Sequence, residues 1–317
     1  MFYYSVHGVS LDCDTDLPEL DALRLAQERG ECWIKVRLSN TNGDHPLSAS
    51  WFSRSALANG NAAVLCGKLD AGYLLRYAGL ADFMLDDAGS EVQCIRAHPD
   101  IAPQTLRHLL LDRVLPLALN LRGYHVIHAT AIATPAGVCA FIGPSGAGKS
   151  TLAASFAANG HSIFCDDCLV VRIERGIFCM PGYPGLRLWQ DSFSALASHF
   201  IRASDATFSL SKFRVSTNSQ LLPGPLHRLK AIFRINRLPY GRPADVCVQR
   251  LTGSEAFVEL ASSAYLLDVT QPDTLRRHFR FVERVLGEIP LNTLLLPTDF
   301  ACLPAARQLI VNEVERA

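Results

Sequence analysis

Residues 143–150 read GPSGAGKS and match the phosphate-binding pattern G-x-x-x-x-G-K-[ST] at every fixed position. The apolar run VCAFI, residues 138–142, comes directly before the first glycine, and the alanine-rich run TLAASFAANG, residues 151–160, follows the serine. A buried strand, a glycine-rich turn and a helix in this order are the context that the pattern needs. These residues predict a P-loop inside an α/β domain; a glycine-rich turn without a ligand is the alternative.

The residue types of this loop suit a phosphate chain. Glycines let successive backbone N–H groups point at phosphate oxygens, and the helix that starts near Lys149 adds the positive end of its dipole. Lys149 would bridge the β- and γ-phosphates, and the Ser150 hydroxyl would bind Mg²⁺. We expect ATP and Mg²⁺ as cofactors, with the nucleotide bound by Gly143, Pro144, Ser145, Gly146, Ala147, Gly148, Lys149, Ser150 and Thr151.

The stretch FCDDC, residues 164–168, offers two pairs of reactive side chains. Cys165 and Cys168 stand an odd number of residues apart, so an extended segment sends them to opposite faces, and nearby carboxylates raise thiol pKa values. We therefore expect core thiols rather than a metal or redox pair. Asp166 and Asp167 end an apolar strand, where ligands of open α/β sheets bind and a carboxylate can hold Mg²⁺ or accept a proton. A solvated acidic turn is the alternative for this pair.

Composition limits the class of protein. The chain has 317 residues, is 49% hydrophobic and 19% charged, and balances 30 Lys and Arg against 30 Asp and Glu. Zero formal charge gives no overall attraction to nucleic acid or to anionic membranes, and we expect neither as a partner. The N-terminal residues lack a secretory signal pattern, charges interrupt the most apolar stretch, and ten cysteines are spread along the chain. We expect a cytoplasmic protein with reduced thiols.

Changes in pattern divide the chain into two predicted domains. Residues 1–100 hold short β-like runs between Asn-, Gly- and Asp-rich turns and predict a smaller, β-rich N-terminal domain. A helix is expected over 103–122, and strand and helix patterns then alternate around the P-loop, so residues 101–317 predict a layered α/β domain. Residues 124–134 are expected as one strand, and residues 202–228 as a polar, irregular segment.

The run HATAIATPAGVCAFIGPSGAGKSTLAASFAANGHSIFCDDCLVV, residues 128–171, resembles the catalytic core of HPr kinase/phosphorylase and its relatives. In that family a histidine precedes the P-loop and an Asp-Asp pair ends the next strand. The resemblance implies a P-loop kinase domain of the HPr kinase/PEP carboxykinase-like type over residues 101–317. It also implies that Asp166 is the general base, that Asp167 joins Ser150 at the metal or orients its neighbour, and that Lys149 and His128 belong to the catalytic set.

Two differences refine the resemblance. His128-Ala129 stands where the family usually has His-Gly, and the chain has no downstream E-[IV]-R-G-x-G stretch. In these respects it is more similar to HPr-kinase-like proteins associated with ribosomal peptide maturation, which phosphorylate a serine of a precursor peptide. Taken without the resemblance, His128 on an apolar strand fits a packed core residue.

The resemblance implies an ATP- and Mg²⁺-dependent kinase that acts on a hydroxyl, in particular a serine of a peptide or small protein. Because HPr kinases form hexamers, a homo-oligomer is also implied as a form to test. A small-metabolite kinase on the same core, a nucleotide-driven switch and a nucleotide-binding module without catalysis are the alternatives.

Several further side chains have two interpretations each. Arg187 fits either an interior phosphate ligand or a structural role. Lys212 and Arg214 fit either cations of a lid or ordinary surface residues. Tyr183 and Trp189 could stack on adenine, although core packing is the usual role of aromatic residues.

Overall fold

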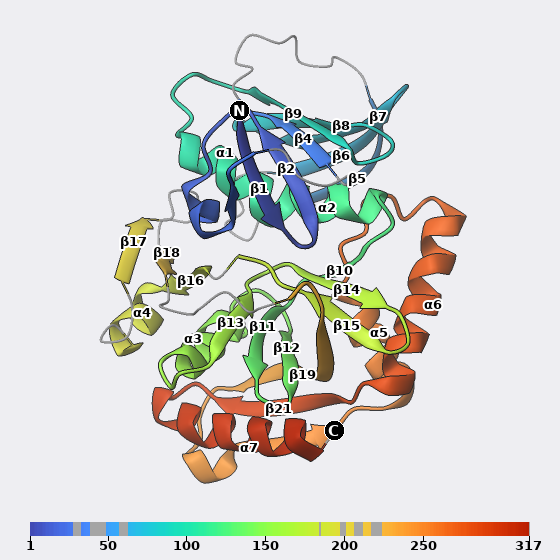
Figure 1. Cartoon of the computed structure of the whole chain (residues 1–317). Helices are drawn as coiled ribbons and strands as arrows, with labels where there is room; N and C mark the ends of the chain where they lie inside the picture. The colour runs from blue at the N-terminus through green and yellow to red at the C-terminus, as the bar shows by residue number, and fades with distance from the viewer. Residues whose placement is uncertain are drawn as a thin grey trace. The chain divides into compact units, whose positions relative to one another are not determined.

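The computed structural model describes residues 1–27, 33–38, 49–56, 63–183, 185–196, 201–205, 212–216 and 224–316 (Figure 1). They form two compact units. The described residues of unit 1 lie within Met1–Tyr124 and Tyr265–Leu275, and those of unit 2 within His125–Asp205, Ser211–Ala264 and Arg276–Ala317. The helical segment after residue 100 thus packs with unit 1, whereas the sequence predicts domains 1–100 and 101–317.

Unit 1 is built on one nine-stranded sheet, with strand order β3-β1-β2-β4-β9-β8-β7-β6-β5. Its first two strands form a hairpin in which Val6 pairs with Val9, and His7 and Gly8 turn the chain with positive φ angles, as a two-residue hairpin requires. The strands are β1 (Phe2–Val6), β2 (Val9–Cys13), β3 (Arg24–Leu25), β4 (Trp33–Arg37), β5 (Ser50–Ala56), β6 (Ala63–Leu69), β7 (Gly72–Tyr77), β8 (Ala81–Leu85) and β9 (Glu91–Arg96), and a short helical turn, η1, spans Pro18–Leu23.

The helix expected over 103–122 is present as three joined pieces, α1 (Pro103–Leu109), η2 (Leu110–Val114) and α2 (Leu115–Leu121). The middle piece is a π-helical turn, and Pro116 is the second residue after its end. Proline has no N–H, so the α-helical hydrogen bond to the carbonyl of Asp112 cannot form. The hydroxyl of Tyr265 donates to that carbonyl over 3.2 Å, which ties the second segment of unit 1 to the first.

Unit 2 is centred on strands in the order β13-β11-β12-β19-β21-β20. β12, β19 and β21 run parallel, so their carboxyl ends share one edge, while β11 and β20 are antiparallel to their neighbours. The start of β19 also pairs with β15, which continues the sheet through β14 to β10. The strands are β10 (His125–Ile127), β11 (Thr130–Thr134), β12 (Gly137–Ile142), β13 (Ser162–Cys165), β14 (Leu169–Ile173), β15 (Ile177–Met180), β19 (His227–Leu238), β20 (Cys247–Arg250) and β21 (Leu291–Pro297).

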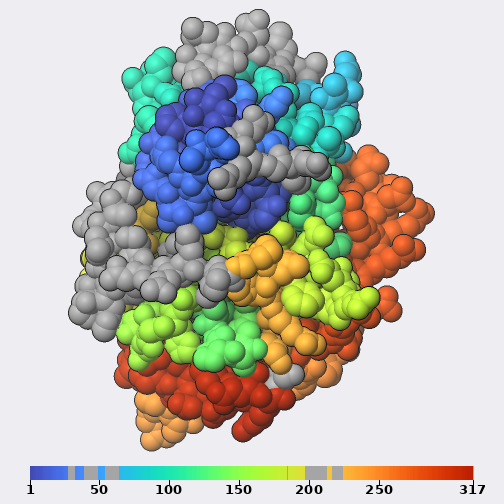
Figure 2. Space-filling view, in the orientation of Figure 1, coloured from blue at the N-terminus to red at the C-terminus, as the bar shows by residue number. Residues whose placement is uncertain are grey.

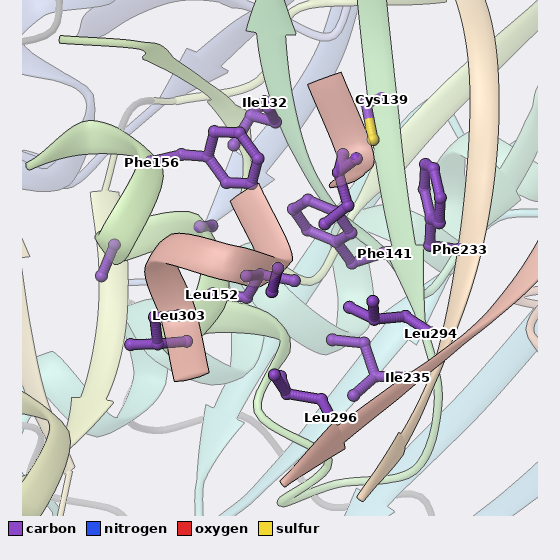
Figure 3. Packing of buried hydrophobic residues seen from close by; sticks show 14 of the residues in the cluster. Ile132, Cys139, Phe141, Leu152, Phe156, Phe233, Ile235, Leu294, Leu296 and Leu303 are labelled. Carbon is purple, nitrogen blue, oxygen red and sulfur yellow. The ribbon is translucent and has the colours of Figure 1, made fainter. Parts of the chain in front are cut away.

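Helices cover both faces of this sheet. One hydrophobic core joins the sheet to α3 (Lys149–Ala157) and α7 (Leu303–Arg316), and the other joins it to α5 (Gly253–Ser262) and α6 (Pro272–Glu288). Cys139 and Phe141 of β12 belong to the first core (Figure 3), and Val138, Ala140 and Ile142 belong to the second, as the alternation of a strand requires. The outer side of α7 is at the surface (red in Figure 2). A strand buried on both faces explains why VCAFI is apolar throughout, and the mixed α/β fold class is confirmed.

A three-stranded sheet corrects the expectation of an irregular segment over 202–228. β17 (Ile201–Asp205) and β18 (Lys212–Ser216) form this sheet with β16 (Gly185–Trp189), and β19 already begins at His227. The alternation in KFRVS, with Val215 fully buried, is the pattern of a short strand. The rest of the expected segment, apart from 224–226, lies outside the described residues. α4 (Gln190–Leu196) follows β16 directly.

The strand expected over 124–134 is also divided. β10 ends at Ile127 and pairs with β14, whereas β11 begins at Thr130 and pairs with β12 and β13. His128 lies at the break, where its N–H donates to the carbonyl of Ser263 over 2.6 Å. Its side chain is 29% exposed, so His128 is not the packed core residue that an unbroken apolar strand would hold.

Candidate functional site

The predicted P-loop, residues 143–150, begins after the carboxyl end of β12 and runs into the start of α3, in the order of strand, loop and helix that the sequence predicts. Gly143 has a φ of 139° and Gly148 a φ of 96°, in the left-handed region that favours glycine. Space is restricted as well, because a Cβ on Gly143 would lie 3.3 Å from both the Ala147 Cβ and the Ile235 carbonyl oxygen. Residues 144–146 are exposed, so the outer part of the loop is open to solvent.

Lys149 is the first residue of α3 and is buried. Its Nζ donates to the carbonyl of Gly143 over 2.8 Å and to that of Pro144 over 3.2 Å. The side chain therefore folds back over the loop, with its ammonium group on the same turn that presents the backbone amides. This places a positive charge where phosphates would bind. Two residues further along α3, the hydroxyl of Thr151 is 2.9 Å from the hydroxyl of Ser192 in α4, and this contact joins the two helices.

Asp166 follows the last residue of β13 and is 4% exposed. One carboxylate oxygen accepts hydrogen bonds from the hydroxyls of Thr130 (2.6 Å) and Ser150 (3.0 Å), and the other accepts from the backbone N–H of Arg187 (3.0 Å). Burial, and then the adjacent carboxylate of Asp167, raise the pKa of Asp166, while Arg187 and the hydrogen bonds oppose the shift. The P-loop serine and the first aspartate are thus in direct contact.

Asp167 faces a different set of groups. Its φ of 59° is in the left-handed region, which aspartate tolerates better than most residues. One carboxylate oxygen is 3.1 Å from Nε2 of His128, and the other is ion-paired with the guanidinium of Arg187. Arg187 is 9% exposed and contacts both aspartates, one through its backbone and one through its side chain.

The structure brings the predicted residues together in a specific arrangement. Ser150 contacts Asp166, whereas the resemblance implies that Ser150 and Asp167 meet at the metal. His128 lies beside Asp167, with its Nε2 3.1 Å from a carboxylate oxygen. Sequence reasoning missed Thr130, because a threonine on a strand carries no signal of a partner 36 positions away, and left Arg187 undecided.

The other side chains with two interpretations lie in or near β16, the strand that carries Arg187, and its neighbour β18. Arg187 and Arg214 are directly opposite each other in β16 and β18, and the Arg214 guanidinium lies 5.4 Å from the centre of the Tyr183 ring. Tyr183 is buried, as expected for a core aromatic residue. Trp189 is 39% exposed, because it ends β16 where the chain turns into α4. The side chain of Lys212 lies outside the described residues.

Cys165 and Cys168 are both buried, and burial raises the pKa of the Cys165 thiol well above its usual value. None of the nine cysteines in the described part of the chain forms a disulfide. These observations agree with core thiols. Within the same residues, no helix is long and apolar enough to cross a membrane.

The donors at the P-loop fit a magnesium ion that is shared with a phosphate chain. Mg²⁺ prefers oxygen ligands and binds proteins through one or two side chains, with waters and substrate phosphates completing its shell. The Ser150 hydroxyl and the Asp166 carboxylate supply two such oxygens 3.0 Å apart. Among the described residues, no cluster of three or more His, Cys, Asp or Glu could hold a metal by itself.

No protein-family model matches the chain, and no curated protein matches it. Among solved structures, 37 chains match. One of them is the HPr(Ser) kinase/phosphatase from Coxiella burnetii, which is 13% identical, with 60% of this chain and 97% of that chain covered and a TM-score of 0.29. A likeness this weak supports no argument about the fold or the function.

Proposed function

We propose that this protein is an ATP- and Mg²⁺-dependent kinase that transfers the γ-phosphoryl group to a hydroxyl of a peptide or small protein, in particular a serine. One observation carries the proposal. The hydroxyl of the P-loop Ser150 donates to the buried carboxylate of Asp166, with Lys149 on the same loop, so phosphate-binding and metal-binding groups meet at the carboxyl ends of β12 and β13.

The loop amides and Lys149 hold the β- and γ-phosphates in this proposal. Ser150 and Asp166 hold Mg²⁺, which when bound neutralises charge on the phosphate oxygens. Lys149 needs only to exchange its two loop carbonyls for phosphate oxygens, because its ammonium group already lies on the loop. Positioning and charge stabilisation of this kind provide most of the catalysis in phosphoryl transfer.

Asp167 is the group that receives the acceptor proton in this proposal. His128 and Arg187 fix its carboxylate from two sides, and the partly exposed His128 offers a route for the proton. The sequence-based alternative gives this role to Asp166 and places Asp167 at the metal. The raised pKa of Asp166 favours that alternative, because a carboxyl group with a higher pKa is a stronger base.

The acceptor class is supported by the resemblance of residues 128–171 to HPr-kinase-like proteins, some of which phosphorylate precursor peptides. A cytoplasmic location and a homo-oligomer are part of the same proposal. A small-metabolite acceptor and hydrolysis without an acceptor are outcomes that the following test distinguishes.

The purified protein is incubated with ATP and Mg²⁺, with and without serine-containing peptides from its genomic neighbourhood, and peptide mass and ADP are measured. We expect one added phosphate on a peptide, lost in Lys149→Ala and retained in Arg228→Ala. Arg228 is an exposed residue at the start of β19 and serves as the control. ADP formation without a modified peptide would favour hydrolysis or a small-molecule acceptor. Absence of both products and of nucleotide binding would refute the proposal.

A further inference from the structure

Arg237 lies directly against the P-loop, although it is 89 positions further along the chain. It is near the end of β19, and its Nη1 is 2.6 Å from the position that a Cβ on Gly148 would occupy. Gly148 is the residue at which α3 begins, next to Lys149 and Ser150. A cation thus touches the backbone at the point where the helix presents its free N–H groups.

The pairing of the strands explains this position. β12 and β19 run parallel, with Ile142 opposite Arg234, so the residues that follow Arg234 continue beside the P-loop. The carbonyl of Ile235 already approaches Gly143 in this way. In open α/β sheets, ligands bind outside the carboxyl ends of parallel strands, and Arg237 occupies such an end.

The Arg237 guanidinium forms no hydrogen bond or ion pair with any residue that the structure describes, although its backbone pairs with β21. Arg234 on the same strand provides the contrast, because its Nη1 pairs with Glu255 (3.2 Å) and Glu259 (2.7 Å). Arg237 is partly buried, and burial lowers its pKa, with Asp191 as the charge that opposes the shift. Among the described residues this partly desolvated guanidinium has no hydrogen-bonded or ion-paired carboxylate, and a bound anion would offset the cost of its burial.

We propose that Arg237 is a phosphate ligand of this site: its guanidinium donates hydrogen bonds to the phosphate chain of the nucleotide held by the P-loop amides. The inference rests on the proposed nucleotide-dependent function and adds a residue that the P-loop pattern does not contain. Arginine suits the role because its planar fork can bind two phosphate oxygens and keeps its charge when partly buried. The contact is with phosphate and not with the base, so the ligand class is any linear polyphosphate.

Binding of ATP and of inorganic tripolyphosphate, each with Mg²⁺, is measured by calorimetry for the wild-type chain, Arg237→Gln, Arg237→Met and Arg228→Gln. Arg237→Met keeps the apolar stem, and Arg228→Gln removes the same charge at the opposite, exposed end of β19. Loss of a charge-assisted hydrogen bond should weaken both ligands on the order of 10- to 100-fold in both Arg237 variants. Arg228→Gln should bind both as the wild type does. A cooperative thermal unfolding transition in the absence of ligand identifies the variants that are folded.

Three results would overturn the inference. Unchanged affinity for both ligands in a folded Arg237 variant would show that the residue does not contact the ligand. Weaker ATP binding with unchanged tripolyphosphate binding would show that Arg237 contacts the nucleoside and not the phosphates. An equal loss of affinity in Arg228→Gln would show that the effect comes from the overall charge of the protein and not from a contact of Arg237. Failure of the wild-type chain to bind either ligand would instead refute the proposed function itself, so the two failures are distinguishable.

Discussion

Asp166 and Asp167 are neighbours in sequence, but different groups surround their carboxylates. Thr130, Ser150 and the Arg187 amide bind Asp166, whereas His128 and the Arg187 side chain bind Asp167. A backbone turn with positive φ at Asp167 separates the two side chains. Because the two carboxylates have separate partners, one can bind a metal ion while the other accepts a proton.

If Asp166 binds the metal ion and Asp167 accepts the proton, the two Asn variants should have different kinetic defects. Asp167→Asn should lower kcat by about 10²- to 10⁴-fold, the usual contribution of a general base, with no change in the Mg²⁺ concentration at half-maximal rate. Asp166→Asn should raise that Mg²⁺ concentration, because a neutral amide is a weaker ligand. Initial rates over a Mg²⁺ titration measure both quantities. The reverse pattern would assign the base to Asp166, as the family resemblance implies.

The raised pKa of Asp166 also predicts how stability depends on pH. Its native pKa is above its unfolded pKa of about 3.9, so between these values the native state binds more protons. The free energy of unfolding therefore falls as pH rises through that window. Asp166→Asn should remove this contribution and flatten the slope in urea unfolding between about pH 4 and the native pKa. The exposed Asp70→Asn should keep the wild-type slope; an unchanged slope in Asp166→Asn would contradict the prediction.

At the level of elements, the P-loop depends on the packing of β12 against α3. Phe141 is fully buried, and its ring centre is 6.0 Å from that of Phe156 on α3 and 6.4 Å from that of Phe233 on β19. Phe141→Ala should lower the free energy of unfolding by about 3–5 kcal/mol, because it removes a large apolar side chain and leaves a cavity. Val258→Ala, at a position 62% exposed, should change it by about 0.5 kcal/mol or less. Chemical denaturation measures the free energy of unfolding of both variants. If Phe141→Ala lost as little as Val258→Ala, neighbouring side chains would have moved to fill the cavity.

Elements with a local signal could be predicted from the sequence. The strand, loop and helix around residues 143–150 are an example, because their glycines, lysine and flanking apolar runs all lie within about 23 consecutive residues, residues 138–160. The break at His128 had no local signal, since apolar residues continue on both sides and only pairing with different neighbours divides β10 from β11.

The candidate site could be predicted only in part for the same reason. Lys149, Ser150, Asp166 and Asp167 come from one strand–helix–strand segment, and the structure brings them together, although their roles remain predictions. Thr130, Arg187 and Arg237 enter from β11, β16 and β19, and their positions follow from strand order and register. Sequence spacing does not report strand order, so the choice between Asp166 and Asp167 as the partner of Ser150 needed the fold.

At the scale of the whole molecule, each compact unit is assembled from segments that are distant in sequence. Tyr265–Leu275 packs in unit 1, more than a hundred residues after Tyr124, between two segments of unit 2. Contacts of this kind join far parts of the chain, so we expect the folding of unit 1 to depend on residues outside the first 124. The division into domains is therefore not a single cut in the sequence.

The hydrogen bond from Tyr265 to the carbonyl of Asp112 tests this dependence, because it spans 153 positions. Tyr265→Phe removes this hydrogen bond and should lower the free energy of unfolding by about 1 kcal/mol, the usual net contribution of one such bond. Tyr240→Phe is the matched control, since Tyr240 is 88% exposed and loses the same hydroxyl. Urea unfolding followed by a probe in unit 1 should separate the two variants. Equal stabilities would show that the second segment is held to unit 1 without a contribution from this bond.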